Sequence, residues 1–168
     1  MKTRDLDIIY NKIADQSKKI FFFKNICIKN NFKHRLEIFE LNLIIILWYM
    51  KLVDLKKNYS EYIISFFVKD LENVIREFGE PDSRIAKNVR TMTENFYGRL
   101  YSYSTSFDEI LSKRKCRDFK KKLKKNFGCN SINYSELEKY IFSNIIFFSK
   151  LKVSDFLKLK FTFASSYF

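Results

Sequence analysis

Hydrophobic residues recur at helical spacing along most of the chain. The cleanest stripe has spacings of 4, 3, 4, 4 and 3 and consists of Ile85, Val89, Met92, Phe96, Leu100 and Tyr103. An earlier stripe has spacings of 4, 4, 3 and 4 and consists of Ile63, Phe67, Leu71, Val74 and Phe78. Residues 41–50 (LNLIIILWYM) are apolar nearly all round, which is typical of a helix at the centre of a bundle. The pattern therefore predicts a helical protein.

Capping signals and glycines give the expected ends of these helices. A capping box at residues 58–61 (NYSE) opens the second stripe, Gly79 ends it, and Asp82 is a suitable N-cap for the next helix. The expected helices cover about residues 5–24, 36–57, 58–78, 83–103, 112–127 and, after a second capping box (SELE, 135–138), 135–150. The alternation in FLKLKFTF (156–163) fits either a short helix that frays or a small edge strand.

Turn-forming residues are scarce, which argues against β-strands in addition to the predicted helices. The 168 residues include only three Gly and one Pro, whereas strand-rich folds need many turns. We predict an all-α fold, a single bundle of about six or seven helices forming one domain over residues 1–168. The apolar run at 41–50 is about ten residues long, and a membrane-spanning helix needs about 20. We therefore expect a buried core helix there.

The charge of the chain is strongly positive. There are 32 Lys and Arg against 19 Asp and Glu, a net charge of +13. This charge indicates an anionic partner such as RNA, a ribosome or lipid headgroups, or it follows from the AT-rich codons of Lys, Asn, Ile, Phe and Tyr. Nine bases lie in the expected helix at 112–126, with Cys116, Phe119, Leu123 and Phe127 facing inward. These candidate contacts for an anionic surface are Lys113, Arg114, Lys115, Arg117, Lys120, Lys121, Lys122, Lys124 and Lys125.

The chain offers little material for catalysis. Its only histidine, His34, lies in a polar segment and is expected at the surface. Three separated glycines form no phosphate-binding loop, and the three cysteines lack metal-ligand spacing and are expected to be reduced. The acid pairs Glu37/Glu40 and Asp70/Glu77 are interpreted as surface carboxylates. We expect no catalytic residue, cofactor, metal or small-molecule substrate, and hence no enzyme.

Gly98 lies inside the expected helix at 83–103, and its presence there needs a reason. Glycine inside a helix costs about 1 kcal/mol relative to alanine. Gly98 lies off the apolar stripe, either at a tight crossing with another helix or at a contact with a partner. The candidate partner-binding residues on this side are Lys87, Arg90, Glu94, Tyr97, Gly98, Arg99 and Tyr101. For Arg99 an internal ion pair with Asp70 or Glu77 is an equal alternative.

Residues 68–103 (VKDLENVIREFGEPDSRIAKNVRTMTENFYGRLYSY) closely resemble the ubiquinol–cytochrome c chaperone family. Matching positions, in the family's order, are Arg76, Glu77, Gly79, Asp82, Lys87, Met92, Glu94, Phe96, Tyr97, Gly98, Arg99 and Tyr103. FEL (39–41) and FVKD (67–70) match more loosely, and the resemblance covers about residues 10–111. Residues 81–87 are more polar than the family's usual turn, and residues 42–48 lack a histidine found in many members.

The resemblance implies a non-catalytic, all-helical assembly factor. Family members protect newly made cytochrome b until it joins ubiquinol–cytochrome c reductase, and mitochondrial members act with a small partner protein near the ribosomal exit at the inner membrane. The start of the chain has acidic residues and no apolar run, so we expect no presequence and a bacterial relative. The expected location is cytoplasmic or peripheral on the cytoplasmic face of the inner membrane (the matrix side if mitochondrial). A basic RNA- or ribosome-binding module is the alternative function.

Overall fold

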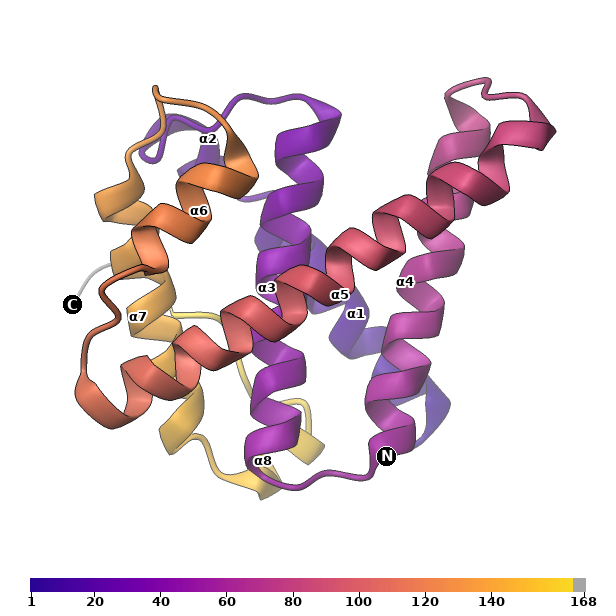
Figure 1. Ribbon diagram of the computed structural model, residues 1–168. Coiled ribbons are helices and arrows are strands. Elements are labelled where there is room, and N and C mark those ends of the chain that lie inside the picture. Colours follow the sequence, from indigo (N-terminus) through magenta and orange to yellow (C-terminus); the bar gives the residue numbers. More distant parts are fainter. Residues whose placement is uncertain (165–168) are drawn as a thin grey trace.

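The computed structural model describes residues 1–164, and this part of the chain consists of eight α-helices without a β-strand (Figure 1). The helices are α1 (Thr3–Ser17), α2 (Ile20–Lys24), α3 (Phe32–Leu52), α4 (Lys57–Glu77), α5 (Asp82–Lys113), α6 (Phe119–Phe127), α7 (Tyr134–Lys150) and α8 (Val153–Leu157). Two of them, α2 and α8, have only five residues each. The prediction of an all-α bundle is confirmed.

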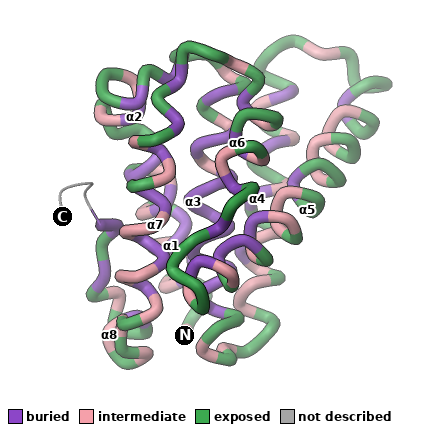
Figure 2. Tube along the Cα trace, turned by 60° about the vertical axis from the view of Figure 1, so that its left-hand side comes forward, coloured by how far each residue is buried: buried purple, intermediate pink, exposed green. Residues whose placement is uncertain are grey.

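Helix α3 runs through the centre of the molecule. It packs against α1, α4, α5, α6 and α7, with the long α5 crossing in front of it in Figure 1. Every residue from Glu40 to Met50 is buried, and Figure 2 shows the burial along α3. The apolar run at 41–50 is therefore a core helix, as predicted. Within residues 1–164 no helix is long and apolar enough to cross a membrane.

Helices α4 and α5 form an antiparallel hairpin whose tip projects past the body of the bundle (Figure 1). Gly79 ends α4 with a φ of 76°, a conformation that glycine adopts without steric cost. Arg76 donates to Asp82 at 2.7 Å and to Glu72 at 2.8 Å, which links the two arms of the hairpin. Asp82 is the first residue of α5 rather than its N-cap, which is Pro81.

All residues of the two expected apolar stripes except one are buried or half-buried. Phe39, Phe67 and Phe96 join α3, α4 and α5, with ring centroids 5.6 Å and 4.9 Å apart along that chain of contacts. Phe78, expected as the last inward residue of its stripe, is instead exposed because it lies in the projecting tip.

A polar network joins α1, α3 and α7 inside the core. The Tyr140 hydroxyl donates to Asn42 Oδ1 at 2.7 Å and accepts from Gln16 Nε2 at 3.0 Å. Asn42 Nδ2 donates to Ser17 Oγ at 3.0 Å. Asn42 thereby has partners despite lying in the most apolar run of the chain, as a buried amide requires.

Several expected helix boundaries were wrong. The helix expected at 5–24 is broken before α2, since Lys19 is extended, and Phe22 then packs on Tyr140 at 5.1 Å. Helix α3 begins at Phe32 because the Asn31 side chain accepts from His34 N at 3.0 Å.

Two capping predictions also fail in detail. Helix α4 begins at Lys57, so the box expected at 58–61 lies inside the helix. Helix α7 begins at Tyr134 because Asn133, rather than Ser135, accepts from Glu136 N at 3.2 Å. Each actual start lies one or two residues before the position that the sequence motif indicated.

The basic helix expected at 112–127 is divided between two elements. Helix α5 continues to Lys113, and Arg114 ends it in the left-handed region with a φ of 56°. Helix α6 begins only at Phe119, and Gly128 ends it with a φ of 62°, as expected. The inward positions of the predicted helix, Cys116, Phe119, Leu123 and Phe127, are nevertheless all buried.

The last described residues are held against α7. The Asn144 side chain accepts from Ala164 N at 2.9 Å and donates to its carbonyl oxygen at 3.3 Å. Of the two alternatives for the tail, the structure contains the short helix, α8, and the described residues after it, 158–164, form a turn and then a segment without regular secondary structure. Within residues 1–164, one core cluster includes buried residues of all eight helices. The single domain over residues 1–168 stays a prediction.

Candidate functional site

The candidate partner-binding residues of α5 lie on two different faces of that helix. Lys87, Arg90, Glu94, Tyr97, Gly98 and Tyr101 are exposed. Arg90 pairs with Glu94 at 2.8 Å one turn along the exposed face, so these two charges partly satisfy each other. Arg99 has turned away from them toward α3, and its side chain is 19% exposed. The sequence grouped Arg99 with its neighbours, whereas the fold separates them.

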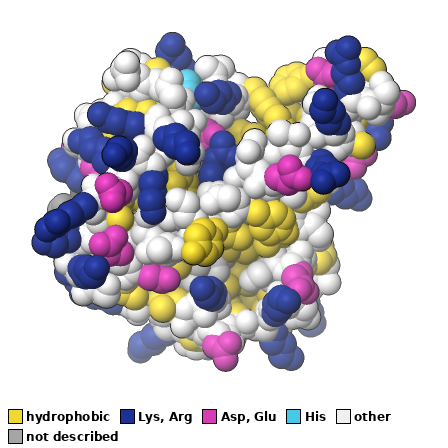
Figure 3. All heavy atoms as spheres, viewed as in Figure 1, with side chains coloured by type: hydrophobic (Ala, Val, Ile, Leu, Met, Phe, Trp, Pro, Cys, Tyr) yellow, Lys and Arg dark blue, Asp and Glu magenta, His cyan; other side chains and the backbone are white. Residues whose placement is uncertain are grey.

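Tyr97 and Tyr101 border an apolar groove where α5 crosses α3 and α4. We call it the tyrosine groove; it has a volume of about 560 Å³ and is lined by Leu47, Trp48, Ile64, Tyr97, Leu100, Tyr101 and polar neighbours including Lys51, Asp54, Lys57 and Asp108. Tyr97 is 50% exposed and Tyr101 is 79% exposed. Figure 3 shows hydrophobic side chains gathered on this face of the molecule.

The walls of the tyrosine groove are fixed by internal contacts. Trp48 donates its ring N–H to Asp108 Oδ1 at 2.8 Å, and its ring packs edge-on against Phe107 with centroids 5.9 Å apart. An indole held at both its polar and its apolar side forms a rigid surface. The groove therefore combines a firm floor with two exposed aromatic side chains, the residue type enriched at protein interfaces.

A second apolar groove lies between α1, α3 and α4. We call it the phenylalanine groove; it has a volume of about 540 Å³, and its aromatic lining consists of Tyr10, Phe32, Phe39, Phe67 and Phe78. Phe78 packs edge-on against Phe32 with centroids 5.0 Å apart, and Tyr10 donates to Asp70 at 3.0 Å. Asp70 is thus engaged by Tyr10 and not by Arg99.

Gly98 faces open space, so the tight helix crossing proposed from the sequence is wrong. A Cβ atom added to Gly98 would meet no atom within 4 Å among the described residues beyond its own helical neighbours. No steric contact within residues 1–164 therefore requires a glycine at this position. The remaining interpretation, contact with a partner, stays a prediction.

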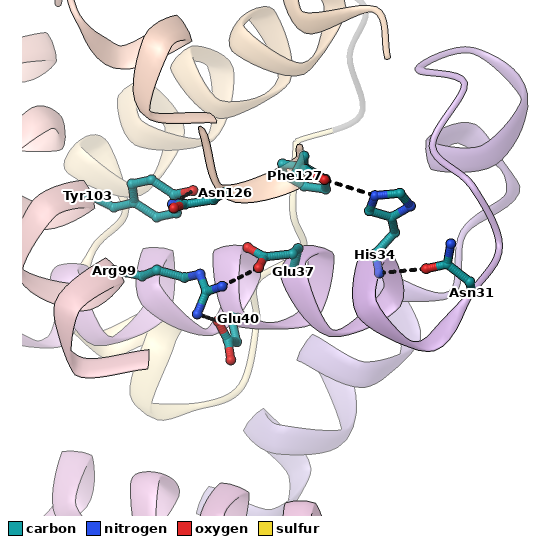
Figure 4. Close-up of polar contacts among 8 residues, drawn as sticks. All are labelled: Asn31, His34, Glu37, Glu40, Arg99, Tyr103, Asn126 and Phe127. Carbon is teal, nitrogen blue, oxygen red and sulfur yellow. Dashed lines mark hydrogen bonds and ion pairs between the residues drawn. The ribbon is translucent and has the colours of Figure 1, made fainter. Parts of the chain in front are cut away.

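Arg99 forms a buried cluster with two carboxylates of α3. Its guanidinium donates to Glu37 and lies between the Glu37 and Glu40 side chains, as Figure 4 shows. Arg99 Nη1 is 3.2 Å from Glu40 Oε2, and Glu37 and Glu40 are only 4% and 1% exposed. The expectation that Glu37 and Glu40 are surface acids was wrong. The internal pairing of Arg99 is present, but with these acids instead of Asp70 or Glu77.

The Arg99 cluster is incompletely satisfied. Within residues 1–164, Glu37 Oε2, both carboxylate oxygens of Glu40 and Arg99 Nε have no hydrogen-bond partner. Glu40 and Arg99 are close enough for an ion pair but are not aligned for a hydrogen bond. Burial raises the pKa of Glu40 to about 8, against the opposing effect of Arg99 and with a further increase from Glu37. Burial also raises the pKa of Glu37 above its ordinary value, although Arg99 and Lys33 oppose this.

His34 is buried beside the same cluster and is not the surface residue expected from the sequence. Its Nε2 lies 3.0 Å from the carbonyl oxygen of Phe127, and the two rings stack with centroids 6.1 Å apart. Figure 4 shows this contact, which fastens the start of α3 to the end of α6. The polar residues around His34 in the sequence were misleading because α3 already begins at Phe32, so His34 is helical and its ring contacts the end of α6.

Three of the nine basic candidates form an ion pair or a side-chain hydrogen bond within the chain, and we call these three tethered. Lys120 donates to Ser135 at 2.8 Å, Lys122 donates to Ser106 at 2.7 Å, and Lys113 lies 3.4 Å from Glu109. The other six, which we call untethered, have no ion pair or side-chain hydrogen bond within residues 1–164: Arg114, Lys115, Arg117, Lys121, Lys124 and Lys125. Of these, Lys124 has its ammonium 5.8 Å from the centre of the Tyr134 ring. Figure 3 shows Lys and Arg gathered on the side of the molecule that carries α6.

Sequence reasoning missed the roles of Glu37, Glu40 and His34. A signal for Glu40 was available, since Glu40 directly precedes the apolar run at 41–50, which was itself expected to be buried. A fully buried carboxylate needs a charged partner, and that partner is Arg99. Among the described residues, no group of three or more His, Cys, Asp or Glu is placed to hold a metal ion. The three cysteines are free.

Comparison with known proteins places this arrangement in a family. Residues 25–163 match the family model described as ubiquinol–cytochrome C chaperone. The chain belongs to the ubiquinol–cytochrome c chaperone family. The resemblance found in residues 10–111 thus extends through the C-terminal helices. Membership supports a chaperone or assembly role for ubiquinol–cytochrome c reductase.

The fold also has a counterpart of known structure. The chain is similar to the crystal structure of the Cbp3 homolog from Brucella abortus, with a TM-score of 0.82 and 16% identity over 97% of this chain and 90% of that chain. At this identity the likeness concerns the fold. No curated protein matches the sequence.

Proposed function

We propose that this member of the ubiquinol–cytochrome c chaperone family is a non-catalytic chaperone that binds newly made cytochrome b and holds it for assembly. Family membership supports the assembly role, and cytochrome b is the client that the resemblance implies. A membrane protein awaiting assembly exposes apolar helices to water, so a chaperone for it needs an apolar docking surface.

The tyrosine groove is the proposed docking surface for the cytochrome b client. The observation that carries this assignment is the pair of exposed side chains, Tyr97 and Tyr101, one helical turn apart on the rim of an apolar groove. Leu47, Leu100 and Ile64 offer aliphatic contacts between them. An apolar client helix would bury both tyrosine rings, whose hydroxyls can still reach water or client polar groups.

The phenylalanine groove is the less suitable of the two apolar grooves for this purpose. There the exposed Phe78 ring already packs on Phe32, and Tyr10 and Asp70 bond to each other across the groove. In the tyrosine groove, by contrast, Tyr101 keeps 79% of its surface exposed. An exposed aromatic ring gains more from being covered than one that already has a partner.

The proposal is tested by the accumulation of cytochrome b in cells that depend on this protein. We expect Tyr97→Ala/Tyr101→Ala to lower cytochrome b accumulation several-fold while the melting temperature stays close to the original, because exposed side chains contribute little to folding. Ile20→Ala is the matched control, since Ile20 is 65% exposed on α2 and lies outside both grooves. Unchanged accumulation in the double variant, or a loss confined to Phe78→Ala, would reject the tyrosine groove.

The proposed location follows from the client. A chaperone that receives cytochrome b during synthesis works beside the inner membrane, on its cytoplasmic face in a bacterium or on the matrix side in a mitochondrion. A ribosome or a small partner protein is the further partner that the family resemblance implies, and no small-molecule substrate is involved in this proposal.

A second candidate function is contact with an anionic surface through the basic residues around α6. It is favoured by the six untethered bases between Arg114 and Lys125. We expect Arg117→Gln/Lys121→Gln/Lys125→Gln to weaken ribosome co-sedimentation and to reduce its salt dependence, since a protein that binds fewer phosphates releases fewer counterions. Lys120→Gln/Lys122→Gln, which changes tethered lysines, is the comparison. Flotation with anionic vesicles separates lipid from ribosome binding, and salt-insensitive sedimentation would exclude this function.

A further inference from the structure

Two polar contacts join α5 to α3 beside the tyrosine groove. One is the Arg99 cluster, in which Arg99 of α5 lies between Glu37 and Glu40 of α3. The other is the hydrogen bond that the Trp48 ring N–H donates to Asp108 Oδ1 at 2.8 Å. Four of the α5 residues between positions 99 and 108 line the tyrosine groove. A separation of α5 from α3 at the Arg99 cluster would therefore move this wall of the groove.

The two acids of the Arg99 cluster are closed off from solvent. Glu37 Oε2 and both oxygens of Glu40 are buried and have no hydrogen-bond partner within residues 1–164. An ionised carboxylate in such surroundings is costly, because neither water nor a hydrogen-bond donor stabilises its charge. A proton on Glu40 removes this cost and leaves one carboxylate, Glu37, opposite one guanidinium, Arg99.

The other groups near the two acids leave Glu40 with Arg99 as its cation. The titratable and charged groups around the pair are Arg99 and Tyr103 from α5 and Lys33 and His34 from α3, and α6 contributes the uncharged Asn126 (Figure 4). Tyr103 stays neutral, because burial raises the pKa of its hydroxyl. Burial raises the pKa of Glu37, and Lys33 is the smallest of the effects that oppose this rise. Within residues 1–164 the exposed Lys33 forms no ion pair with either acid, and no acid or base of α1, α4, α6 or α7 forms one with the cluster.

The Arg99 cluster therefore holds a proton at neutral pH. Burial raises the pKa of Glu40 to about 8, with Arg99 opposing the rise and Glu37 adding to it. Because the buried carboxyl binds the proton more tightly than a hydrated one does, loss of the proton favours any conformation in which water reaches Glu40. Helix α5 crosses in front of α3 (Figure 1), so the conformation that needs least change is a local separation of α5 from α3 at Arg99.

We propose that the Arg99 cluster is a proton-dependent switch of the tyrosine groove. With a proton on its pair of acids, α5 is held against α3 and the groove has both of its walls. Without that proton, α5 separates from α3 at Arg99, the contact between Trp48 and Asp108 loosens, and the wall that carries Tyr97 and Tyr101 moves away.

The switch makes client binding depend on pH in one direction. The closed groove is the form that holds the proton, so a client that needs both walls binds less tightly as the pH rises through about 8. This regulation rests on the proposed function, because it requires the client to dock on the tyrosine groove. The movement of α5 does not require a client.

The test uses Trp48 as a reporter in the absence of any client. Trp48 is the only tryptophan of the chain, is 2% exposed and bonds to α5 through Asp108. We expect acrylamide to quench its fluorescence weakly at pH 6.5 and more strongly at pH 9, with a shift of its emission to longer wavelength. Both changes should have their midpoint near pH 8, while the helical signal in circular dichroism stays the same.

Two variants of the cluster decide the assignment. Glu40→Gln and Glu37→Gln each leave a single carboxylate opposite Arg99, so quenching should stay low in both from pH 6.5 to pH 9. Glu136→Gln, in an acid of α7 that pairs with Lys139, should change with pH as the original does.

Three results would overturn the switch. They are quenching that does not change with pH in the original protein, an equal rise in Glu40→Gln and Glu37→Gln, and a rise that is accompanied by loss of the helical signal, which would mean global unfolding. Because the measurement contains no client, its failure leaves the docking of cytochrome b on the tyrosine groove to be judged by accumulation and crosslinking in cells.

Discussion

At the scale of single residues, Arg99 and Tyr97 are neighbours in the chain with different environments. Tyr97 is half exposed on the rim of the tyrosine groove, while Arg99 lies between two buried carboxylates. Both belong to the Phe-Tyr-Gly-Arg sequence that carries the family resemblance. The sequence identified this segment as important but did not predict the pairing of Arg99, because the partner is determined by where α5 crosses α3.

Replacing Arg99 should lower the free energy of unfolding, because Arg99 pairs with buried acids and not with a partner protein. Arg99→Ala leaves Glu37 and Glu40 buried without a cation, and breaking a buried pair in this way costs about 3–5 kcal/mol. Chemical denaturation at pH 8 measures the loss, and it should be smaller at pH 5 because both acids can then take up protons. A free energy of unfolding within about 1 kcal/mol of the original at pH 8 would show that the cluster contributes little.

Glu40 should make the protein less stable as the pH rises. Its pKa is about 8 in the folded protein against an ordinary 4.5, so between these values the folded state binds more protons than the unfolded state. The stabilisation is fully present below pH 4.5 and is lost as the pH rises through 8. Each unit of pKa difference corresponds to about 1.4 kcal/mol.

The matched variant for this pH dependence is Glu40→Gln, which resembles the protonated acid at every pH. We expect it to equal the original near pH 4.5 and to be more stable by at least about 1 kcal/mol at pH 8.5. Urea denaturation at the two pH values gives the comparison. Parallel pH profiles for the two proteins would mean that Glu40 titrates normally.

At the scale of helices, the sequence predicted which faces are buried better than where helices end. Apart from Phe78, the stripes of α4 and α5 are buried or half-buried, and the expected inward residues of α6 are buried. The boundaries depend on single caps, such as Asn133 at the start of α7, and on tertiary contacts that no local pattern contains. The break at Arg114, where the basic segment divides, has no glycine or proline to mark it.

Gly98 provides a test at the same scale. Since a Cβ there would meet open space within the described fold, Gly98→Ala should gain helix propensity and raise the stability by about 0.5–1 kcal/mol. Thermal denaturation measures the gain, with Ala86→Gly on the exposed side of the same helix as the reverse control. A lower melting temperature for Gly98→Ala would mean that a close contact occupies the space. Increased stability together with reduced cytochrome b accumulation would identify Gly98 as part of a partner contact.

At the scale of the whole molecule, the two candidate surfaces of the proposed function differ in chemistry and in position. The tyrosine groove is apolar, and the bases around α6 form a positive region on another part of the surface (Figure 3). Composition revealed the net charge of +13 but not its distribution, and it did not show that Glu37 and Glu40 are buried.

The central claim, that cytochrome b docks on the tyrosine groove, is tested most directly by site-specific photo-crosslinking in cells that synthesise cytochrome b. A benzophenone amino acid replaces Tyr101 in one variant and Ile20, which is exposed outside the groove, in the other. We predict a cytochrome b adduct from position 101, formed while cytochrome b is newly made, and little or none from position 20. An equal yield from both positions, or an adduct from position 20 alone, would contradict the claim.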